Sequence, residues 1–569
     1  MPKLVVKKKK LGGFAAGGGA GTGKKVTPLR PFGEPKTAPC QVGCPIGNDV
    51  RGALTSVGLA ETWGRSFEEG VEQAFYVFAK TNPMPATLGR LCIRCCEKEC
   101  NRQYKDGAVN INQFERFVGD FAIEKGLSLA PLRATPAQGR EGKIAVVGAG
   151  PAGLSCAYQL ARRGWAVTIF EAGSRPGGLL RHVAPFRLPR RVVDAEIRRI
   201  LDLGVELRTG MVVGRNVSLE ELRAQYRAVY VAVGAHGERT TAAAGQESEN
   251  VFAGAELMRR LDRGERVELG NDVVVIGGGN AALDAARACK RLGAGVTIMY
   301  RRTKAEMPAM AYDVDQAEAE GISFDFLAMP IEMVREGARA VRLVCQRLEL
   351  GEPDARGRRR PVPVRNAAPY ERPVSAVIQA MIPEPDFRSS LSRVGAAGAT
   401  IRWRDGFRTS LAGVFAGGDA NKLNLATMAI AQGKRAAEEI DAELTGAQPK
   451  PAEAGIVVGK DKLKLDWYKP AERHEHAVLP VAERFAEGAL DREVNLGLAR
   501  DVAVDEAKRC FSCGRCMDCD NCWMYCQDQA VVKLEKTLPA GEHYHYKHEL
   551  CTGCEKCAEE CPCWYIAMR

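Results

Sequence analysis

Eleven of the chain's twenty cysteines lie in its last 60 residues, at spacings that suit iron–sulfur chemistry. They include the runs Cys516-x2-Cys519-x2-Cys522-x3-Cys526 and Cys551-x2-Cys554-x2-Cys557-x3-Cys561. Such runs are typical of two-cluster ferredoxin modules, in which the fourth cysteine of each run binds the other cluster. The spacing therefore predicts one [4Fe-4S] cluster on Cys516, Cys519, Cys522 and Cys561, and a second on Cys551, Cys554, Cys557 and Cys526.

Three cysteines of this segment, Cys510, Cys513 and Cys563, are left over by that assignment. Cys510 and Cys513 continue the x2 spacing, so only the x3 step from Cys522 to Cys526 selects the register. Zinc ribbons use similar C-x2-C pairs, but two complete four-cysteine runs favour clusters.

A first glycine fingerprint follows a hydrophobic run that starts at Lys143. The pattern G-x-G-x-x-G lets the backbone approach a pyrophosphate that sits at the start of the next helix. The next predicted strand, 166–171, ends in Glu171, an acid at the spacing of a ribose contact that would reject a 2′-phosphate. These observations predict a dinucleotide site on Gly148, Gly150, Pro151, Ala152, Gly153 and Glu171.

A second fingerprint, G-x-G-x-x-A, follows the hydrophobic run at 272–276. Its next strand, 295–300, ends in Arg301 and Arg302 instead of an acid. Arginine pairs with phosphate through two hydrogen bonds, so the pair favours NADP(H) over NAD(H), unless it is only a solvated strand end. The predicted site comprises Gly277, Gly279, Asn280, Ala282, Arg301 and Arg302.

The acid at the first site and its absence at the second suggest FAD first and a nicotinamide second. Near the C-terminal side, a predicted strand runs into Gly417, Gly418 and Asp419, where a carboxylate can reach the flavin ribityl chain. We therefore expect a flavin domain at 140–257 and 375–447, with the nicotinamide domain, 258–374, inserted between its halves.

Composition is that of a globular, multidomain protein. The 569 residues suggest about three to five domains. There is no apolar run of about 18 residues that would span a membrane, and the basic start has no following apolar segment typical of a secretory signal. Cysteines in C-x2-C series indicate metal binding in a reducing compartment, the cytoplasm. The net charge of +11 fits a solvated basic surface or a docking face for an acidic redox partner, and no pattern favours nucleic acid.

Together these motifs resemble the glutamate synthase small-subunit family of iron–sulfur flavoproteins. The matching stretches are GAGPAGL, GGLL at 177–180, FRLP at 186–189, VAVG at 231–234, GGGNAALD, YRRT and VFAGGD. The resemblance implies that FAD exchanges a hydride with the nicotinamide and electrons singly with clusters, without a catalytic acid or base. It also implies flavin contacts by Gly178, Leu179, Arg187, Gly234, Gly418 and Asp419, with Arg187 near the isoalloxazine.

The N-terminal region, 31–130, resembles the family's helical iron–sulfur domain. The resemblance implies one [4Fe-4S] cluster on Cys44, Cys92, Cys96 and Glu115, three clusters in the whole chain. The family's usual upstream C-x2-C is missing, so Cys40 and Cys100 are expected to be remnants of a lost cluster, and Cys95 is an extra cysteine. Carboxylate ligation is unusual for iron–sulfur sites, and an exposed helix residue is the alternative for Glu115.

The C-terminal extension, a linker at 448–505 and a ferredoxin domain at 506–569, is similar to the branch associated with dissimilatory sulfite reductase (DsrL). That branch implies dissimilatory sulfite reductase as redox partner in sulfur metabolism, with a direction of flow that the sequence does not give. The segment 377–383 departs from the family's V-I-x-A-I-G-Q motif by losing its glycine. A basic, glycine-rich tail is expected at 1–30.

The fold expected is therefore multidomain α/β: a helical iron–sulfur domain, two Rossmann-like domains with one inserted in the other, and an α+β two-cluster ferredoxin domain. The function expected is NAD(P)H:acceptor oxidoreductase. Two alternatives stay open: an electron-feeding subunit of glutamate synthase or a ferredoxin:NADP oxidoreductase, and a non-catalytic FAD-binding sensor or scaffold. A homodimer could form through 61–79 or the linker.

Overall fold

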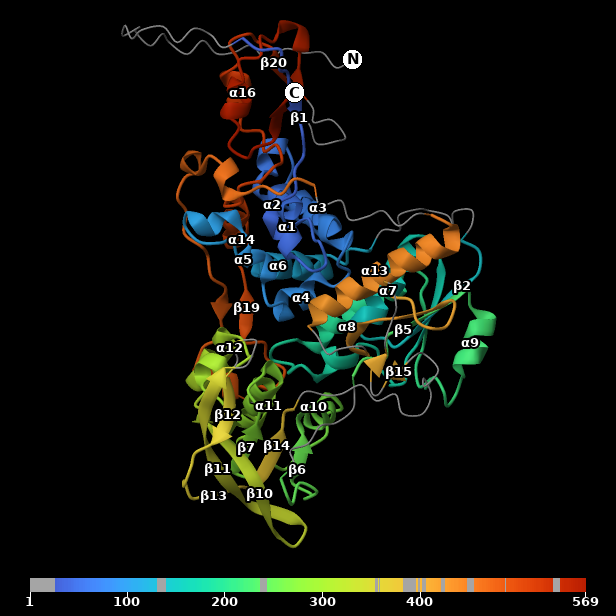
Figure 1. Cartoon of the computed structure of the whole chain (residues 1–569), viewed down its shortest axis with the longest axis vertical. Helices are drawn as coiled ribbons and strands as arrows, with labels where there is room; N and C mark the ends of the chain where they lie inside the picture. The colour runs from blue at the N-terminus through green and yellow to red at the C-terminus, as the bar shows by residue number, and fades with distance from the viewer. Residues whose placement is uncertain are drawn as a thin grey trace.

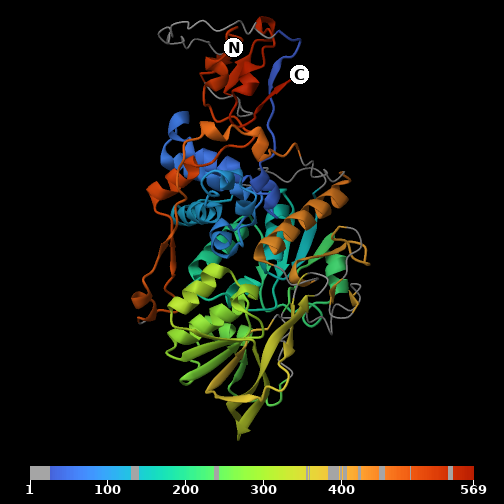
Figure 2. The same ribbon diagram turned by 60° about the vertical axis from the view of Figure 1, so that its left-hand side comes forward.

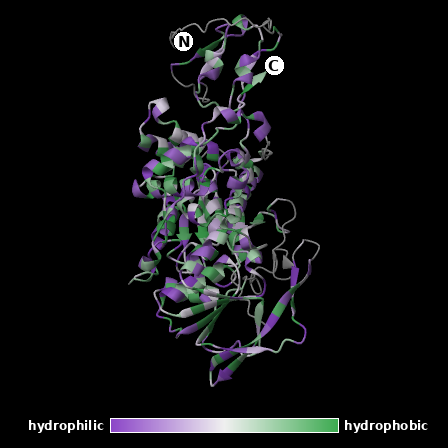
Figure 3. Ribbon diagram, turned by 90° about the vertical axis from the view of Figure 1, so that its left-hand side faces the viewer, coloured by the Kyte–Doolittle hydropathy of each residue, from purple (hydrophilic) through white to green (hydrophobic). Residues whose placement is uncertain are grey.

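The computed structural model describes residues 26–129, 140–235, 243–353, 357, 359–381, 396–397, 400–401, 406–420, 425–447, 455–486, 488–535 and 543–569. The molecule is elongated, with the C-terminal module at one end, the helical domain below it and the two sheet-containing units beyond (Figure 1). Hydrophobic residues are frequent in the helices and strands at the centre of the molecule (Figure 3). Among the described helices, none has the length and apolar character needed to cross a membrane.

The helical domain is built from short helices that cross closely. Gly119 and Gly89 permit the closest crossing, because an added Cβ would lie 2.2 Å from Ala86 N and 2.4 Å from Arg116 Cα respectively. A capping box between Ser66 and Glu69 starts the third helix. The helices are α1 (Pro39–Gly43), α2 (Val50–Gly58), α3 (Phe67–Ala79), α4 (Pro85–Leu91), α5 (Cys95–Lys98) and α6 (Ile111–Glu124).

The first Rossmann-like unit has a parallel sheet in the order β17-β5-β2-β3-β4. Its central strands are buried along almost their whole length, as expected for a parallel sheet covered on both faces. The strands are β2 (Lys143–Val147), β3 (Ala166–Phe170), β4 (Glu206–Arg208), β5 (Ala228–Val231) and β17 (Val414–Ala416), and the helices are α7 (Pro151–Arg162), α8 (Arg190–Leu201), α9 (Leu219–Gln225) and α13 (Ala426–Thr445).

The second unit is inserted between β5 and β17 and has a parallel sheet in the order β6-β14-β7-β8-β9. An antiparallel sheet of β10 to β13 extends it (Figure 1). Its elements are β6 (Val251–Ala253), α10 (Gly254–Asp262), β7 (Asp272–Ile276), α11 (Asn280–Arg291), β8 (Gly295–Tyr300), α12 (Ala311–Ala319), β9 (Ser323–Phe326), β10 (Ala328–Glu336), β11 (Arg339–Pro353), β12 (Arg359–Pro363), β13 (Tyr370–Pro373) and β14 (Ala376–Gln379). The second sheet thus includes β6 and β14, one strand beyond the expected limits of 258–374 at each side.

The linker runs from the junction of the C-terminal module and the helical domain down to the second unit and back (Figure 2). At its far end Arg484 Nη1 donates to Glu320 Oε1 at 2.9 Å. On the way it forms the pair β18 (Ala477–Val478) and β19 (Asn495–Gly497), and it returns through α14 (Arg500–Lys508) to the helical domain. The linker is therefore packed against several domains.

The C-terminal module contains α15 (Asn521–Met524), β20 (Val531–Lys533), β21 (Tyr544–Tyr546), α16 (Lys556–Glu559) and β22 (Ile566–Met568). Its last strand pairs with β1 (Pro31–Gly33), so the start of the helical domain completes the module. Of the expected tail, 1–25 lies outside the described residues, whereas Thr27 and Arg30 make main-chain hydrogen bonds to Thr552 and Arg569.

Candidate flavin, nicotinamide and iron–sulfur sites

The first fingerprint forms a tight turn between β2 and α7. Gly148 has φ +103°, and a Cβ there would lie 2.4 Å from Ala232 O. A Cβ on Gly153 would lie 1.9 Å from Gly148 O, so the helix can pack on the strand only with glycine. The N-cap, Gly150, offers no side-chain acceptor to the helix. The first amides of α7 are therefore available to an anion.

This turn opens onto a cavity of about 580 Å³, within the range of cofactor sites (about 300–1,000 Å³). Of the predicted residues, twelve line it: Gly148, Gly150, Pro151, Ala152, Glu171, Gly178, Leu179, Arg187, Gly234, Asn280, Gly418 and Asp419. Six lie outside its walls: Gly153, Gly277, Gly279, Ala282, Arg301 and Arg302. The bare helix start and the volume fit a dinucleotide such as FAD.

Glu171 is fixed by main-chain donors at the mouth of the fingerprint. Its Oε2 accepts from Ala149 N at 2.8 Å and its Oε1 from Gly173 N at 2.7 Å. Both bonds hold the carboxylate on the cavity wall beside the turn, the place where a ribose would lie in this type of fold.

The cavity also has walls that the sequence analysis missed. His182 lies on the wall, and so do Met258 and Asp284 from the second unit and Leu91 from the helical domain. His182 stands near the GGLL stretch, which is a usable signal. Leu91 carries no such signal, because only the tertiary fold brings the end of α4 to the cavity.

Arg187 ties the two units together at the cavity. Its Nη1 lies 3.3 Å from Asp284 Oδ2 on α11, and its Nη2 lies 3.5 Å from Asp313 Oδ2 on α12. Burial alone would lower the pKa of Arg187, but these two carboxylates raise it instead. A permanently charged guanidinium is thereby held on the cavity wall.

The second fingerprint is the turn between β7 and α11. Gly277 has φ +147°, and a Cβ on Gly278 would lie 2.4 Å from the Tyr300 ring. Asn280 Oδ1 accepts from Met310 N at 3.1 Å, so the turn is tied to the loop after β8. Arg301 and Arg302 follow β8 directly; Arg301 is exposed, and Arg302 Nε donates to Arg359 O at 3.2 Å.

The predicted ligands of the helical domain are neighbours in the fold. Burial raises the pKa of Cys92 to about 11, and negative charge on Glu115 and Cys44 adds to the shift. The pKa of Cys96 is raised by burial and then by Cys44 and Cys92. Each effect requires proximity, so the four side chains lie together although they come from three separate segments.

Glu115 is buried on α6 rather than exposed. Its Oε1 accepts from Asn48 Nδ2 and from Asn82 Nδ2, both at 2.9 Å, and burial raises its pKa to about 7. An ionised carboxylate is costly in such a place unless a cation compensates it. The iron of a cluster would supply that charge, so the donor set fits.

The cysteines of each predicted C-terminal cluster also lie close together. Burial raises the pKa of Cys522, and the charges of Cys516, Cys519 and Cys561 raise it further. Burial raises the pKa of Cys557 to about 12, with added effects from Cys526, Cys551 and Cys554. Every cysteine of the described chain is free, and within the described ranges no three Cys, His, Asp or Glu side chains are arranged around a single metal ion.

The chain matches two known families. The family described as pyridine nucleotide-disulphide oxidoreductase matches residues 142–433, and dihydropyrimidine dehydrogenase domain II, 4Fe-4S cluster, matches residues 34–127. The second match covers the helical region in which the sequence predicted an iron–sulfur domain, so the fold class expected from the sequence is confirmed.

Curated relatives agree with these matches. The chain is 36% identical to NADP(+)-dependent formate dehydrogenase subunit beta of Moorella thermoacetica, over 84% of this chain and 71% of the relative. It is 32% identical to NADPH-Fe(3+) oxidoreductase subunit beta of Geobacter sulfurreducens, over 86% and 77%. It is 34% identical to the glutamate synthase [NADPH] small chain of Azospirillum brasilense, over 71% and 86%.

The flavin-type cavity, the second fingerprint and the gathered cysteines are consistent with these matches and with the resemblance found in the sequence. The chain therefore belongs to the pyridine nucleotide-disulphide oxidoreductase family, among the iron–sulfur flavoproteins related to the glutamate synthase small subunit, and is an FAD- and iron–sulfur-dependent NAD(P)H oxidoreductase.

Proposed function

We propose that the chain passes electrons between NADP(H), FAD and at least three [4Fe-4S] clusters, to or from a protein partner. The observation that carries this proposal is the shared cavity. Its wall contains the first fingerprint, Asn280 and Ala281 at the start of α11, and Leu91, the residue before Cys92. A flavin held there would be next to a nicotinamide on one side and a cluster ligand on the other.

The side chains of this site bind and orient; none needs to transfer a proton. When bound, FAD supplies the exchange of a hydride for single electrons. The α7 amides and Glu171 hold the dinucleotide, Arg187 keeps a positive charge on the wall, and apolar residues such as Met258 exclude water. Thr427, next to the cavity residue Ala426, is close enough to Cys92 to lower the pKa of its thiol, so the flavin and cluster sites are neighbours.

NADP(H) is the proposed nicotinamide. Arg301 and Arg302 stand at the carboxyl end of β8, where a ribose-binding acid would stand in an NAD site. All three relatives reported above carry NADPH or NADP(+) in their names. The cluster ligands proposed are Cys44, Cys92, Cys96 and Glu115; Cys516, Cys519, Cys522 and Cys561; and Cys526, Cys551, Cys554 and Cys557.

The proposed partner is dissimilatory sulfite reductase, on the strength of the resemblance of the C-terminal cysteine pattern. Oxidation of sulfur would then reduce NADP+, and the reverse flow would support sulfite reduction. The proposed compartment is the cytoplasm, where free thiols persist. A homodimer remains a proposal from the sequence alone.

A second candidate is an electron-feeding subunit of another enzyme, glutamate synthase in particular, or a ferredoxin:NADP oxidoreductase. Three relatives favour this class, since they are named as beta subunits or a small chain. Assays with glutamine and 2-oxoglutarate plus a large subunit would separate it from the first candidate. A non-catalytic sensor is the last alternative.

The test is anaerobic titration of the purified protein with NADPH and with NADH, followed by optical and EPR spectroscopy. We expect flavin and clusters to be reduced at lower concentration of NADPH than of NADH. Transfer to dissimilatory sulfite reductase is then measured directly. Clusters that neither nicotinamide reduces would overturn the proposal, and reduction without transfer to the sulfite reductase would remove that partner.

A further inference from the structure

Four cysteines that no predicted cluster uses meet at one place in the fold. Cys40 and Cys100 belong to the helical domain, and Cys510 and Cys513 lie more than 400 residues later, directly after α14. All four line the same small cavity, together with Leu54 and Phe511. From the sequence, Cys40 and Cys100 are expected to be remnants of a lost cluster, and Cys510 and Cys513 are left over by the assignment of the ferredoxin clusters.

The four thiols are also electrostatic neighbours. Burial raises the pKa of Cys40 well above its usual value, and negative charge on Cys100, Cys510 and Cys513 raises it further. The pKa of Cys510 is raised to about 12 by burial first and then by Cys513 and Cys100. Cys40 and Cys513 are buried, Cys100 and Cys510 are partly buried, and none of the four forms a disulfide. Ionised thiolates in such a place are costly unless a cation compensates them.

The cavity wall is built for negatively charged sulfur. Asn101 Nδ2 lies 3.6 Å from Cys513 Sγ, and Ser512 N lies 3.4 Å from Cys510 Sγ. Arg51 and Arg102 also line the wall; the charge of Arg102 is paired with Asp106, whose Oδ1 lies 2.6 Å from its Nε. Arg51 is 7% exposed, its Nε makes no hydrogen bond, and its ion pair with Asp49 is 3.9 Å long, so this donor has spare capacity.

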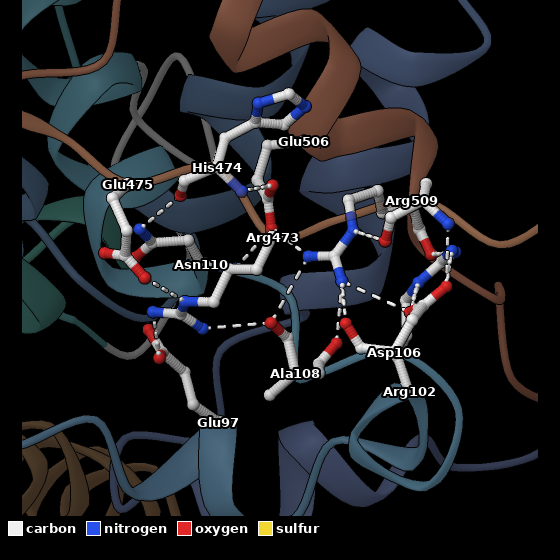
Figure 4. A network of polar contacts seen from close by, with 12 residues as sticks. Glu97, Arg102, Asp106, Ala108, Asn110, Arg473, His474, Glu475, Glu506 and Arg509 are labelled. Carbon is white, nitrogen blue, oxygen red and sulfur yellow. Dashed lines mark hydrogen bonds and ion pairs between the residues drawn. The ribbon is translucent and has the colours of Figure 1, made fainter.

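A buried polar network joins the segments that carry Cys100 and Cys510 (Figure 4). Arg509, which precedes Cys510 and is 2% exposed, donates to Gly107 O at 2.8 Å and to Glu506 Oε1 at 2.5 Å. Glu506 also accepts from Asn110 N at 2.7 Å. Arg102, two residues after Cys100, donates back to Arg509 O. The network joins the segment that carries Cys100 to the helix that delivers Cys510.

We propose that Cys40, Cys100, Cys510 and Cys513 hold a further [4Fe-4S] cluster, with two thiolates from each end of the chain. The C-terminal pair would replace the C-x2-C that is missing upstream of Cys40. The choice of a cluster over zinc rests on the neighbouring cysteine sets, which have cluster spacings, and on the N–H groups directed at sulfur, which tune iron–sulfur sites.

The position of this site suggests its role. Tyr468 is buried against both cysteine groups: its pKa is raised by burial and then by Cys563, Cys513, Cys510 and Cys561. The proposed cluster would therefore stand between the helical domain and the ferredoxin module. It would take one electron at a time from the flavin side and pass it to the module, or the reverse; this role rests on the proposed function, whereas the metal site does not.

The first test is metal analysis of wild-type, full-length protein purified anaerobically. Four clusters predict about sixteen irons and sixteen sulfides per FAD, against about twelve for three clusters. About twelve irons would overturn the proposal, and so would about twelve irons with one zinc. This count needs no NADPH, so it is independent of the titration that tests the proposed function. The metal site can be refuted while the proposed function stands, and the proposed function can be refuted while the metal site stands.

The second test locates the site with Cys510→Ser and Cys513→Ser, singly and together. We expect each to lose about four irons and one EPR-detectable cluster per chain while FAD is retained. The matched controls are Cys345→Ser, a buried cysteine of β11 in the second unit, and Cys563→Ser, a leftover of the ferredoxin module. Variants that keep the full iron content would overturn the proposal; if they fail to fold, the wild-type count still decides.

Discussion

The two cysteine-rich regions of the molecule are organised in opposite ways. In the C-terminal module, runs of cysteines with two or three residues between them supply two ligand sets almost by themselves. In the helical domain, the proposed set is assembled from distant segments: Cys44, Cys92 at the end of α4 with Cys96 in α5, and Glu115 on α6. The further set proposed above even combines both ends of the chain.

The difference shows that local spacing specifies a cluster only where the backbone folds tightly around it. The C-terminal module has little core besides its cysteines, with short strands and a few aromatic residues such as Tyr544 and Tyr565. The helical domain instead shares a continuous core with the first sheet and with Phe511 and Cys513. Its ligands are positioned by that packing and by buried polar bonds.

The largest effect is expected from Arg509→Ala, which removes the hydrogen bonds between the helical domain and the segment before Cys510. The change removes the arginine that pairs with the fully buried Glu506, and removes the bonds that hold the segment before Cys510. We expect the free energy of unfolding to fall by about 3–5 kcal/mol, measured by denaturant titration. The neighbouring exposed Lys508→Ala is the control and should change it by less than about 0.5 kcal/mol. Equal effects of the two variants would contradict the role of the network.

Glu115→Ala tests the one carboxylate among the proposed ligands. Two buried amides, Asn48 and Asn82, lose their acceptor, which should cost about 2–4 kcal/mol of unfolding free energy. The iron content should fall by about four per chain, while the C-terminal clusters stay. Glu115→Gln is the informative control: it keeps an acceptor and most of the stability but loses the ionised oxygen. Full iron in both variants would rule Glu115 out as a ligand.

A pH dependence is expected where α8 of the first Rossmann-like unit packs against α4 of the helical domain. Glu196 is fully buried, accepts from Ala86 N and Thr87 N at the start of α4, and has its pKa raised from 4.5 to about 7, chiefly by burial. Because the folded-state pKa is the higher one, this contribution is complete below pH 4.5 and is lost as the pH rises through 7. Between pH 5 and 8 we expect a loss on the order of 2 kcal/mol. Glu196→Gln should flatten the curve of unfolding free energy against pH; an unchanged slope would assign the dependence to other groups.

The smallest effect is expected from Tyr468→Phe. Its hydroxyl donates to Phe511 O at 2.7 Å, so removal should cost about 1 kcal/mol and leave the iron content unchanged. Exposed Tyr104→Phe serves as the control in thermal unfolding. Loss of iron in the Tyr468 variant would contradict this expectation, because it would mean that the hydroxyl group is needed to position the cysteine ligands.

Much of the architecture was predictable from the sequence. The fingerprints at Gly148 and Gly277 identified both Rossmann-like units, because a turn that brings backbone close to phosphate needs glycine at fixed positions. The insertion of the second unit followed from the late strand before Gly418. The exact limits of the second unit were not predictable from the sequence. β6 and β14 are short strands that join its sheet only because β14 pairs with β7 and β6 pairs with β14.

What the sequence alone determined is local: the cysteine runs, the glycine turns, and the order of the units. Only the tertiary structure brought Leu91 and Asp284 to the flavin cavity, closed the module with β1, and gathered Cys40 and Cys100 with Cys510 and Cys513. The physical reason is range. Spacing fixes side chains a few residues apart, because the backbone between them has few conformations, whereas contacts across hundreds of residues depend on the packing of whole domains and on buried bonds such as those of Arg509.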